Sequence, residues 1–417
     1  MIYQFFVILA LAFLLVFNKR KRFFTEQIIL FCSVFSVYVL FALWSNSYIE
    51  NPFRDFFISI DQIFFYSEPF YLKNHSIKEI FKISFTDFRY SELPLIIFYY
   101  SVLMKWAQAL GVTDFLLFLK VNTAFIGSLI PIFLYKIIRV FNAQGNIYRP
   151  ILAFAIFSPL LYLSCQIMRD VHIALLYTIG VYLVVNDKIR FRLFYLFIIF
   201  ILVYYLRVES GLFFILFIAV QQYDNFKKFD IWGKVLILVG LLALFILAII
   251  PALGVFAQTQ ESYSNRSLEA ASVSSLGAKL LGLPFPINYL GMTAFGQILP
   301  FPIWLPLDDR AAYAYLRILE CFQPIYWLPI IGGVIIGCYR YRRHIDLKWL
   351  MLVGIAVLYL IAISASEVNV RRLFAVYPLL FCACLYLQKH FMLNVQRLRK
   401  QCVVILVFFH LIYWIIK

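Results

Sequence analysis

The sequence predicts an all-α fold, a polytopic bundle of transmembrane helices, and three observations lead to it. The chain has 417 residues, of which 64% are hydrophobic and only 14% charged, whereas soluble globular chains average about 45–50% apolar and about 25% charged residues. Apolar runs of about 18 residues or more, long enough to cross a bilayer, recur along its length. Short alternating segments, which a transmembrane β-barrel would show, do not occur. We therefore expect one transmembrane domain over residues 1–417, with no large soluble domain.

The chain begins with two apolar runs, Ile2–Phe17 and Ile28–Trp44. The first lacks a basic start and a small-residue cleavage site, so we expect a retained helix rather than a signal peptide. The basic residues Lys19–Arg22 between the two runs should be cytoplasmic by the positive-inside rule. The polar segment that follows the second run, Asn51–Glu92, is then on the outer side.

This polar segment belongs to a first outer-face loop, residues 45–114, in which we expect interfacial helices. Its last part, Leu93–Leu110, is apolar enough to span but contains Lys105. A charge at the centre of the bilayer costs about 2.5–3.5 kcal/mol on insertion scales. We therefore expect Leu93–Leu110 to lie along the outer interface, because the later basic clusters then fall inside; the alternative is that it spans.

The remaining apolar runs alternate with basic connections, and together they predict about twelve spans in the whole chain. The connections that hold Lys188, Arg190, Arg342 and Lys400 are expected in the cytoplasm. Residues 254–323, rich in Ser, Pro and Gly, are expected to form a second, long outer-face loop that acts as a lid. The predicted later spans are Phe115–Tyr135, Pro150–Ile167, Ile173–Val185, Leu193–Leu206, Leu212–Val220, Val235–Pro251, Pro324–Cys338, Trp349–Ile363, Phe374–Leu387 and Val403–Ile416.

The net charge of +16 does not indicate nucleic-acid binding. The Lys and Arg residues cluster in short connections, where they orient the chain and contact anionic membrane lipids. A soluble basic domain with interleaved aromatic residues, which would bind a strand, is missing. The seven cysteines and five histidines show no metal-ligand spacing, so neither a metal nor another cofactor is indicated.

Several charged residues at the expected outer face are hard to explain as orientation signals. Three acidic residues are candidates for a catalytic carboxylate, since a partly desolvated carboxylate can accept a proton from a sugar hydroxyl. They are Asp61, Asp170 and Glu209. Four arginines are candidates for binding a phosphate group, because a guanidinium presents a planar fork to phosphate oxygens. These arginines are Arg169, Arg207, Arg371 and Arg372.

Ordinary ion pairing at helix ends is the alternative for each of these residues. The adjacent Arg169 and Asp170 would then cap a helix and reach toward the interface. Arg207 and Glu209 are two residues apart and face away from each other on a helix, so each needs another partner. Motifs for other chemistries, including the Walker loop, HExxH, GxSxG and GxGxxG, are not present in the sequence.

The order of motifs resembles the GT-C superfamily of membrane glycosyltransferases. An outer Asp is followed by Tyr in DQIFFY, and a proline-led aromatic run, ELPLIIFYYSVLMKWAQALG, comes next. Then follow the helical segment KVNTAFIGSLIPIFLYKIIRVF and the segment FSPLLYLSCQIMRD, which closes on Arg-Asp. Two features are more similar to those of the related bacterial polymerases of O-antigen, capsule and exopolysaccharide. They are the two predicted helices that precede the Asp and the segment VNVRRLFAVYP near the end of the sequence. The ordered features cover about the first half of the chain.

The resemblance implies an enzyme, a glycosyltransferase of the bacterial inner membrane, with its active site on the periplasmic face. It would use a polyprenyl (pyro)phosphate-linked sugar donor and a glycan or lipid-linked acceptor to build a cell-surface polysaccharide, by polymerisation or by transfer of single sugars. The family's first-loop acid falls on Asp61, its helix-end acid on Asp170, and its phosphate-binding arginines on the four named above. Many members have paired acids where this chain has Asp61 and Gln62. The alternative function is a transporter or flippase of polysaccharide or lipid-linked oligosaccharide.

Overall fold

In the computed structural model the described part of the chain is helical, and no strand occurs within it. It comprises residues 21–47, 60–141, 147–228, 230–235, 237–247, 249, 280, 283–284, 286–299, 301–303, 321–366, 370–391 and 394–416. The helices are α2 (Lys21–Ser47), α3 (Ile60–Leu72), α4 (Ile77–Thr86), η1 (Phe88–Tyr90), α5 (Pro94–Ala109), α6 (Phe115–Val140), α7 (Tyr148–Phe157), α8 (Pro159–Ser164), α9 (Arg169–Val185), α10 (Arg192–Leu206), α11 (Val208–Lys228), α14 (Ile287–Ile298), α16 (Gln323–Tyr341), α17 (Leu347–Ser366), α18 (Val370–Leu373), η3 (Phe374–Val376), α19 (Tyr377–Phe391) and α20 (Val395–Ile416).

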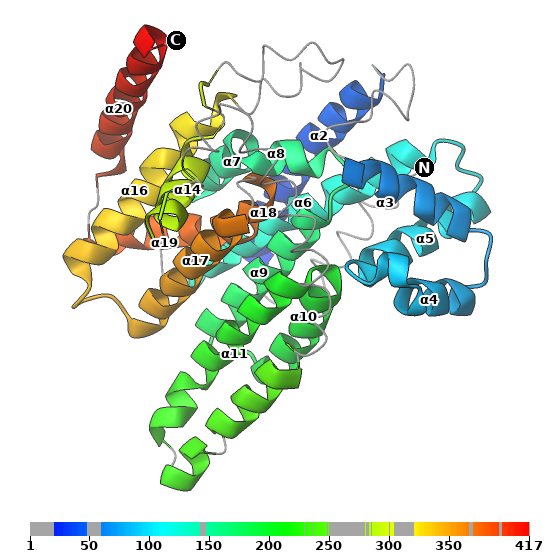
Figure 1. Cartoon of the computed structure of the whole chain (residues 1–417), viewed down its shortest axis with the longest axis horizontal. Helices are drawn as coiled ribbons and strands as arrows, with labels where there is room; N and C mark the ends of the chain where they lie inside the picture. The colour runs from blue at the N-terminus through cyan, green and yellow to red at the C-terminus, as the bar shows by residue number, and fades with distance from the viewer. Residues whose placement is uncertain are drawn as a thin grey trace.

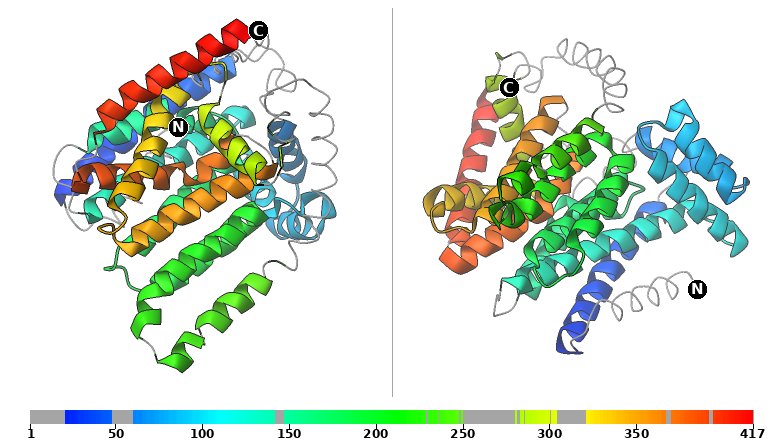
Figure 2. Two further views of the ribbon diagram at one scale, coloured as in Figure 1. Left: turned by 60° about the vertical axis from the view of Figure 1, so that its left-hand side comes forward. Right: turned by 90° about the horizontal axis from the view of Figure 1, so that it is seen from below.

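Helix α6 forms the centre of the bundle. It packs against α2, α9 and α19, and most of its residues are buried. The pair α10–α11 lies beyond α9, and α14, α16 and α17 lie on the other side, with α20 at the outer edge (Figure 1). Helices α3, α4 and α5 form a separate group beside the bundle, as both views of Figure 2 also show. The core is therefore built from helices far apart in the sequence.

Within the described residues, five helical segments are long and apolar enough to cross a membrane, which indicates a multi-pass membrane protein. They are Thr25–Asn46, Phe115–Val140, Leu347–Ser364, Val370–Phe391 and Val395–Ile415. The same part of the chain contains four shorter apolar helices, between 10 and 17 residues long: Tyr148–Phe157, Arg192–Leu206, Val208–Tyr223 and Ile231–Leu247. The predicted all-α membrane fold is confirmed at this level, whereas a bundle of about twelve spans is not.

One predicted span, Pro150–Ile167, is wrong as a continuous helix. The structure divides it into α7 and α8, because Ser158 adopts an extended conformation ahead of Pro159. The Ser158 hydroxyl accepts a hydrogen bond from the Leu160 amide (3.2 Å) and so caps α8. Helix α7 has ten residues, about 15 Å at 1.5 Å per residue, which is half of a bilayer core of about 30 Å. The first predicted run, Ile2–Phe17, lies outside the described residues.

The basic connections gather at one end of the bundle. Lys348, at the start of α17, contacts Asp187, between α9 and α10, at 3.4 Å. At the same end of α6, Arg139 pairs with Glu26 near the start of α2 (3.2 Å). The opposite ends of α9, α10 and α17 therefore meet at the other end of the bundle, where the charged residues described next are found.

The two predicted outer-face loops differ in how much of them the structure describes. Within residues 45–114, α3, α4, η1 and α5 are described, and α5 covers the ambiguous Leu93–Leu110. Helix α5 is not one of the candidate spans and packs against α3, α4, α6 and α10. Most of 254–323 lies outside the described residues, so its role as a lid stays a prediction. The part that is described includes α14, which packs on α16 and α17.

Candidate functional site

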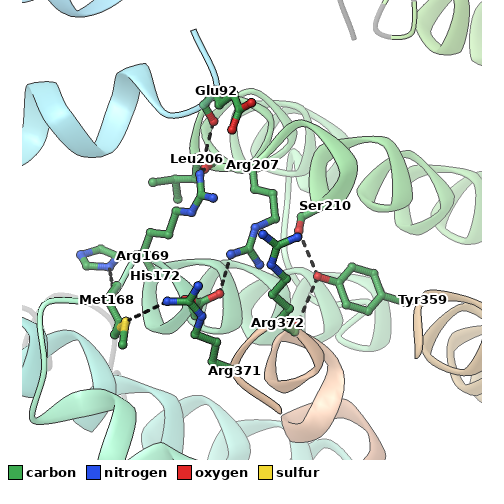
Figure 3. A network of polar contacts seen from close by, with 11 residues as sticks. Glu92, Met168, Arg169, His172, Leu206, Arg207, Ser210, Tyr359, Arg371 and Arg372 are labelled. Carbon is green, nitrogen blue, oxygen red and sulfur yellow. Dashed lines mark hydrogen bonds and ion pairs between the residues drawn. The ribbon is translucent and has the colours of Figure 1, made fainter. Parts of the chain in front are cut away.

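Charged side chains from several elements meet where α9 begins, α10 ends and α18 lies. We call Arg169, Asp170, Arg207, Arg371 and Arg372 the arginine cluster, and Figure 3 labels its four arginines. The structure thus brings together all four arginines that the sequence singled out with Asp170, and Glu209 lies next to Arg207. Their chain positions extend from residue 169 to residue 372, so only the packing of α9, α10 and α18 makes them neighbours.

The central contact of the cluster is the ion pair between Asp170 and Arg207. Asp170 Oδ1 lies 2.6 Å from Arg207 Nη2, and both side chains are only 3% exposed. Arg207 is the extended residue at which α10 ends, and α11 begins at Val208, so the chain turns sharply there. Asp170 is in the first turn of α9, where the helix dipole also favours a negative charge. Arg207 therefore finds across the fold the partner that the sequence could not identify.

Arg169 ties three elements together through backbone oxygens. Its Nη1 donates to the carbonyl of Leu206 (3.1 Å), at the end of α10, and to the carbonyl of Glu92 (3.3 Å), just before α5. The last four carbonyls of a helix have no partner within the helix, so a guanidinium there satisfies one of them. Although Arg169 and Asp170 are adjacent in sequence, Arg169 bonds to carbonyls while Asp170 pairs with Arg207.

Arg371 and Arg372 enter the cluster from α18. Arg371 Nη1 lies 3.9 Å from the sulfur of Met168, the residue before α9. The backbone carbonyl of Arg372 accepts a hydrogen bond from the Tyr359 hydroxyl (3.3 Å), which also lies 3.0 Å from Ser210 Oγ. These contacts hold α18 against the start of α9 and against α17, and Ser210 of α11 meets the same tyrosine (Figure 3).

The cluster holds more positive than negative charge. Among its described residues, four guanidinium groups are accompanied by the carboxylates of Asp170, of Glu209 in the first turn of α11, and of Glu92 at its edge. Nε and Nη1 of Arg207 are buried and have no hydrogen-bond partner among the described residues. Burying a charge or a polar donor without a partner is costly. An anion bound next to Arg207 would supply the missing acceptors.

The cluster also sets the ionisation of Asp170, which lies ahead of the predicted span Ile173–Val185. Burial by itself raises the pKa of a carboxyl group. The positive charges of Arg207, Arg371 and Arg169 outweigh the burial, and the net effect lowers the pKa of Asp170. Asp170 is therefore an ionised counter-ion of Arg207 at neutral pH, and a carboxylate with a low pKa is a weak proton acceptor.

His172 lies beside the cluster and was not singled out by sequence reasoning. Its Nδ1 is 3.2 Å from the carbonyl oxygen of Met168, so Nδ1 carries a hydrogen, because a carbonyl can only accept. Nε2 has no hydrogen-bond partner among the described residues. The rings of Tyr99 and Tyr100 contact the imidazole edge to face. The spacing of His172 from Asp170 was visible in the sequence, but nothing there indicated the enclosing tyrosines.

The two other predicted carboxylates differ in how far the structure describes them. Asp61 is in the first turn of α3, and the structure does not describe its side chain. Glu209 is half-buried and close enough to Arg207 to interact with it electrostatically. The proposed catalytic roles of both residues stay predictions. Sequence reasoning also missed Tyr359 and Ser210, because nothing distinguishes them among the many tyrosines and serines of the chain.

Comparison of the chain with protein-family models, with curated proteins and with solved structures finds no match. Over the described part of the chain, no three His, Cys, Asp or Glu side chains come together in a group that could hold a metal ion.

Proposed function

We propose that the protein is an integral membrane glycosyltransferase that transfers a sugar from a polyprenyl (pyro)phosphate-linked donor, at the outer face of a bacterial inner membrane, to a growing cell-surface glycan. The observation that carries the proposal is the arginine cluster. Among the described residues it holds an excess of positive charge, and two buried nitrogen donors of Arg207 have no partner there, which suits a phosphate group. The order of sequence motifs resembles that of the GT-C superfamily. This resemblance is the reason to propose a sugar as the transferred group and a polyprenyl lipid as its carrier.

The reaction makes specific demands on the cluster. In the transfer, the bond between the sugar C1 and the phosphate oxygen breaks and its electron pair leaves with the phosphate. Preorganised cations stabilise this developing charge and make the phosphate a better leaving group. Arg207 offers Nε and Nη1, and Arg169, Arg371 and Arg372 add to the positive field around it. Asp170 holds Arg207 in place and is a positioning residue in this scheme.

The acceptor hydroxyl must lose a proton as it attacks C1. Asp170 is a poor choice of base, because its pKa is lowered by three arginines. The role falls to Asp61 first, from the sequence motif, and to Glu209 second, which is half-buried next to Arg207. The apolar helices of the bundle would surround the polyprenyl chain, and residues 254–323 would close over the sugars.

The glycans of a deletion strain test this function. The strain is complemented with wild type, with Arg372→Ala, or with Asp187→Asn, a control at the opposite end of the bundle. Arg372 is half-buried rather than fully enclosed, so its truncation is less disruptive than that of Arg207. We expect the Asp187→Asn strain to make wild-type glycan and the Arg372→Ala strain to lose it by about tenfold or more, since a lost charge-assisted contact is worth about 1.5–3 kcal/mol.

The form of the defect identifies the reaction. Loss of long polymer with single repeat units left on the lipid would mark a polymerase, and loss of one sugar from an otherwise intact glycan would mark a single-addition transferase. Unchanged surface and lipid-linked glycans in the deletion strain would overturn the proposal. Complete glycan units that accumulate on the cytoplasmic side would instead favour a flippase.

A further inference from the structure

Helix α4 combines one partly exposed apolar side with one basic side. Its sequence, Ile77–Thr86, begins with a capping box in which Ser76 and Glu79 satisfy each other's backbone amides (3.2 and 2.8 Å). Ile80 and Ser84 are buried toward the rest of the α3–α5 group. Ile77 and Phe81, one turn apart on the neighbouring strip, are 48% and 52% exposed. A helix this short is marginal alone, so the cap and the packed side fix its orientation.

The exposed apolar strip of α4 continues into the outward side of α10. The Phe81 ring stacks on Phe85 (4.6 Å between centroids), and Phe85 meets Tyr205 of α10 edge to face (5.2 Å). Leu193 and Tyr195 are exposed near the start of α10, and five further exposed apolar residues recur every three or four positions along one face of that helix, which is one of the shorter apolar helices. They are Phe194, Phe197, Ile198, Ile201 and Tyr205.

This continuity decides what covers α4. An apolar helix face of a multi-pass membrane protein faces lipid, and the face of α10 ends at Tyr205, directly before the arginine cluster. A tyrosine at that position suits the level of the lipid headgroups. Helix α4 touches the same ring, so it lies at the depth where hydrocarbon gives way to headgroups. Figure 1 shows α4 at the periphery of the fold, on the side of α5 and α10.

The charges next to the exposed strip specify the lipid. Lys78 and Lys82 are exposed and follow Ile77 and Phe81 by one position each, so both extend from the flank of the apolar strip. Their long side chains can keep the ammonium groups among the phosphates while the apolar residues enter the acyl region. Glu79, the acid within α4, is engaged in the cap.

We propose that α4 is a membrane-surface anchor that inserts Ile77 and Phe81 into the leaflet beside the arginine cluster and binds anionic phospholipids through Lys78 and Lys82. The anchor would hold the α3–α5 group, and with it the carbonyl of Glu92 that Arg169 contacts, at a fixed height above the bilayer. This inference does not depend on the chemistry proposed for the cluster.

Photo-crosslinking in nanodiscs tests the anchor. Phe81 is replaced by p-benzoylphenylalanine, and so, in separate variants, are Ile77 and Thr86. Thr86 is nine residues after Ile77, two and a half turns, and therefore lies on the opposite side of the helix. Nanodiscs of phosphatidylcholine alone and with added phosphatidylglycerol are irradiated, and adducts are identified by mass spectrometry. We expect lipid adducts from positions 77 and 81 and about tenfold fewer from position 86, because that side faces water.

The lysines are tested in the same experiment. In mixed nanodiscs the adducts at position 81 should favour phosphatidylglycerol over its share of the lipid. Each of Lys78→Gln and Lys82→Gln should reduce that preference by about fivefold, the equivalent of about 1 kcal/mol per lysine. A preference unchanged by both substitutions would overturn the anionic specificity. Lipid adducts equal at positions 81 and 86, or adducts to a second copy of the chain in their place, would overturn the anchor itself.

Discussion

Asp170 and Arg207 carry opposite charges side by side in the protein interior, 2.6 Å apart and almost without solvent. Removing one partner leaves the other charge buried and uncompensated. We therefore expect Asp170→Asn to destabilise the protein by about 3–5 kcal/mol, as for other broken buried pairs. The control Asp187→Asn disrupts ion pairs of an aspartate that is 67% exposed, and should cost at most about 1 kcal/mol. The stability of both variants is measured by thermal unfolding in detergent, with size-exclusion chromatography as the readout. An equal loss of stability in the two variants would contradict the structural role of the buried pair.

The same pair gives a pH dependence of stability. The pKa of Asp170 is lowered in the folded protein, so its contribution is complete above the unfolded value of about 3.9. It is lost as the pH falls below about 4 and through the lower folded pKa, because the folded carboxylate must then be protonated. Asp170→Asn should therefore lie well below wild type in stability at pH 7, and the difference should shrink at the acid end of the range.

At the scale of elements, the turn between α10 and α11 positions the cluster. Gly211, in the first turn of α11, approaches α10 so closely that an added Cβ would lie 2.6 Å from the Cα of Tyr204. That neighbour is backbone and cannot rotate away, so the two helices would have to separate. The amide of Gly211 also donates to the carbonyl of Arg207 (3.0 Å), which couples this contact to the ion pair.

Gly211→Ala is therefore expected to destabilise the protein by about 1–3 kcal/mol through overpacking and to displace Arg207. Gly354→Ala is the matched control, because a Cβ at this position in α17 meets nothing within 4 Å. That control should be neutral or stabilising by up to about 1 kcal/mol, since alanine favours the helix over glycine. The two variants are compared by thermal unfolding and by the glycan phenotype; a Gly211→Ala protein as stable as the control would show that α10 and α11 are not in close contact.

The elements also show what the sequence could and could not predict. Long apolar runs such as the predicted span Phe115–Tyr135, which the structure extends to Val140, are recognisable because length and composition define them. The break at Ser158–Pro159 has local signals, the serine cap and the proline, but the length and composition of the apolar run do not reflect them. The pairing of Asp170 with Arg207 had no sequence signal, since 37 positions separate them and the adjacent Arg169 was the obvious partner. Contacts through backbone carbonyls, such as that of Leu206 with Arg169, cannot be predicted from residue type, because every residue has a backbone carbonyl.

For the whole molecule, the distribution of charge was the informative property. The positive-inside rule placed the basic connections on one side and the mixed acidic and basic residues on the other. In the structure the contacts of Arg139 and Lys348 lie at one end of the bundle, and the arginine cluster lies at the other. The number of spans could not be predicted in the same way, because apolar composition does not distinguish a spanning helix from a short, buried one.

The proposal as a whole depends on whether the arginine cluster binds a lipid-linked phosphate. The measurement is native mass spectrometry of the full chain in nanodiscs with a polyprenyl phosphate or with the uncharged polyprenol of the same length. Two proteins are compared: wild type, and a double variant with Arg207→Gln and Asp170→Asn, which removes both charges of the pair together and so avoids an unpaired buried charge.

We expect wild type to bind the phosphate about 10- to 100-fold more tightly than the polyprenol, as about 1.5–3 kcal/mol per charged hydrogen bond implies. The double variant should lose most of this preference, although Arg169, Arg371 and Arg372 remain, while it keeps the wild-type unfolding temperature within a few degrees. Equal binding of phosphate and polyprenol by wild type, or an undiminished preference in the folded double variant, would contradict the assignment of Arg207 as the phosphate-binding residue.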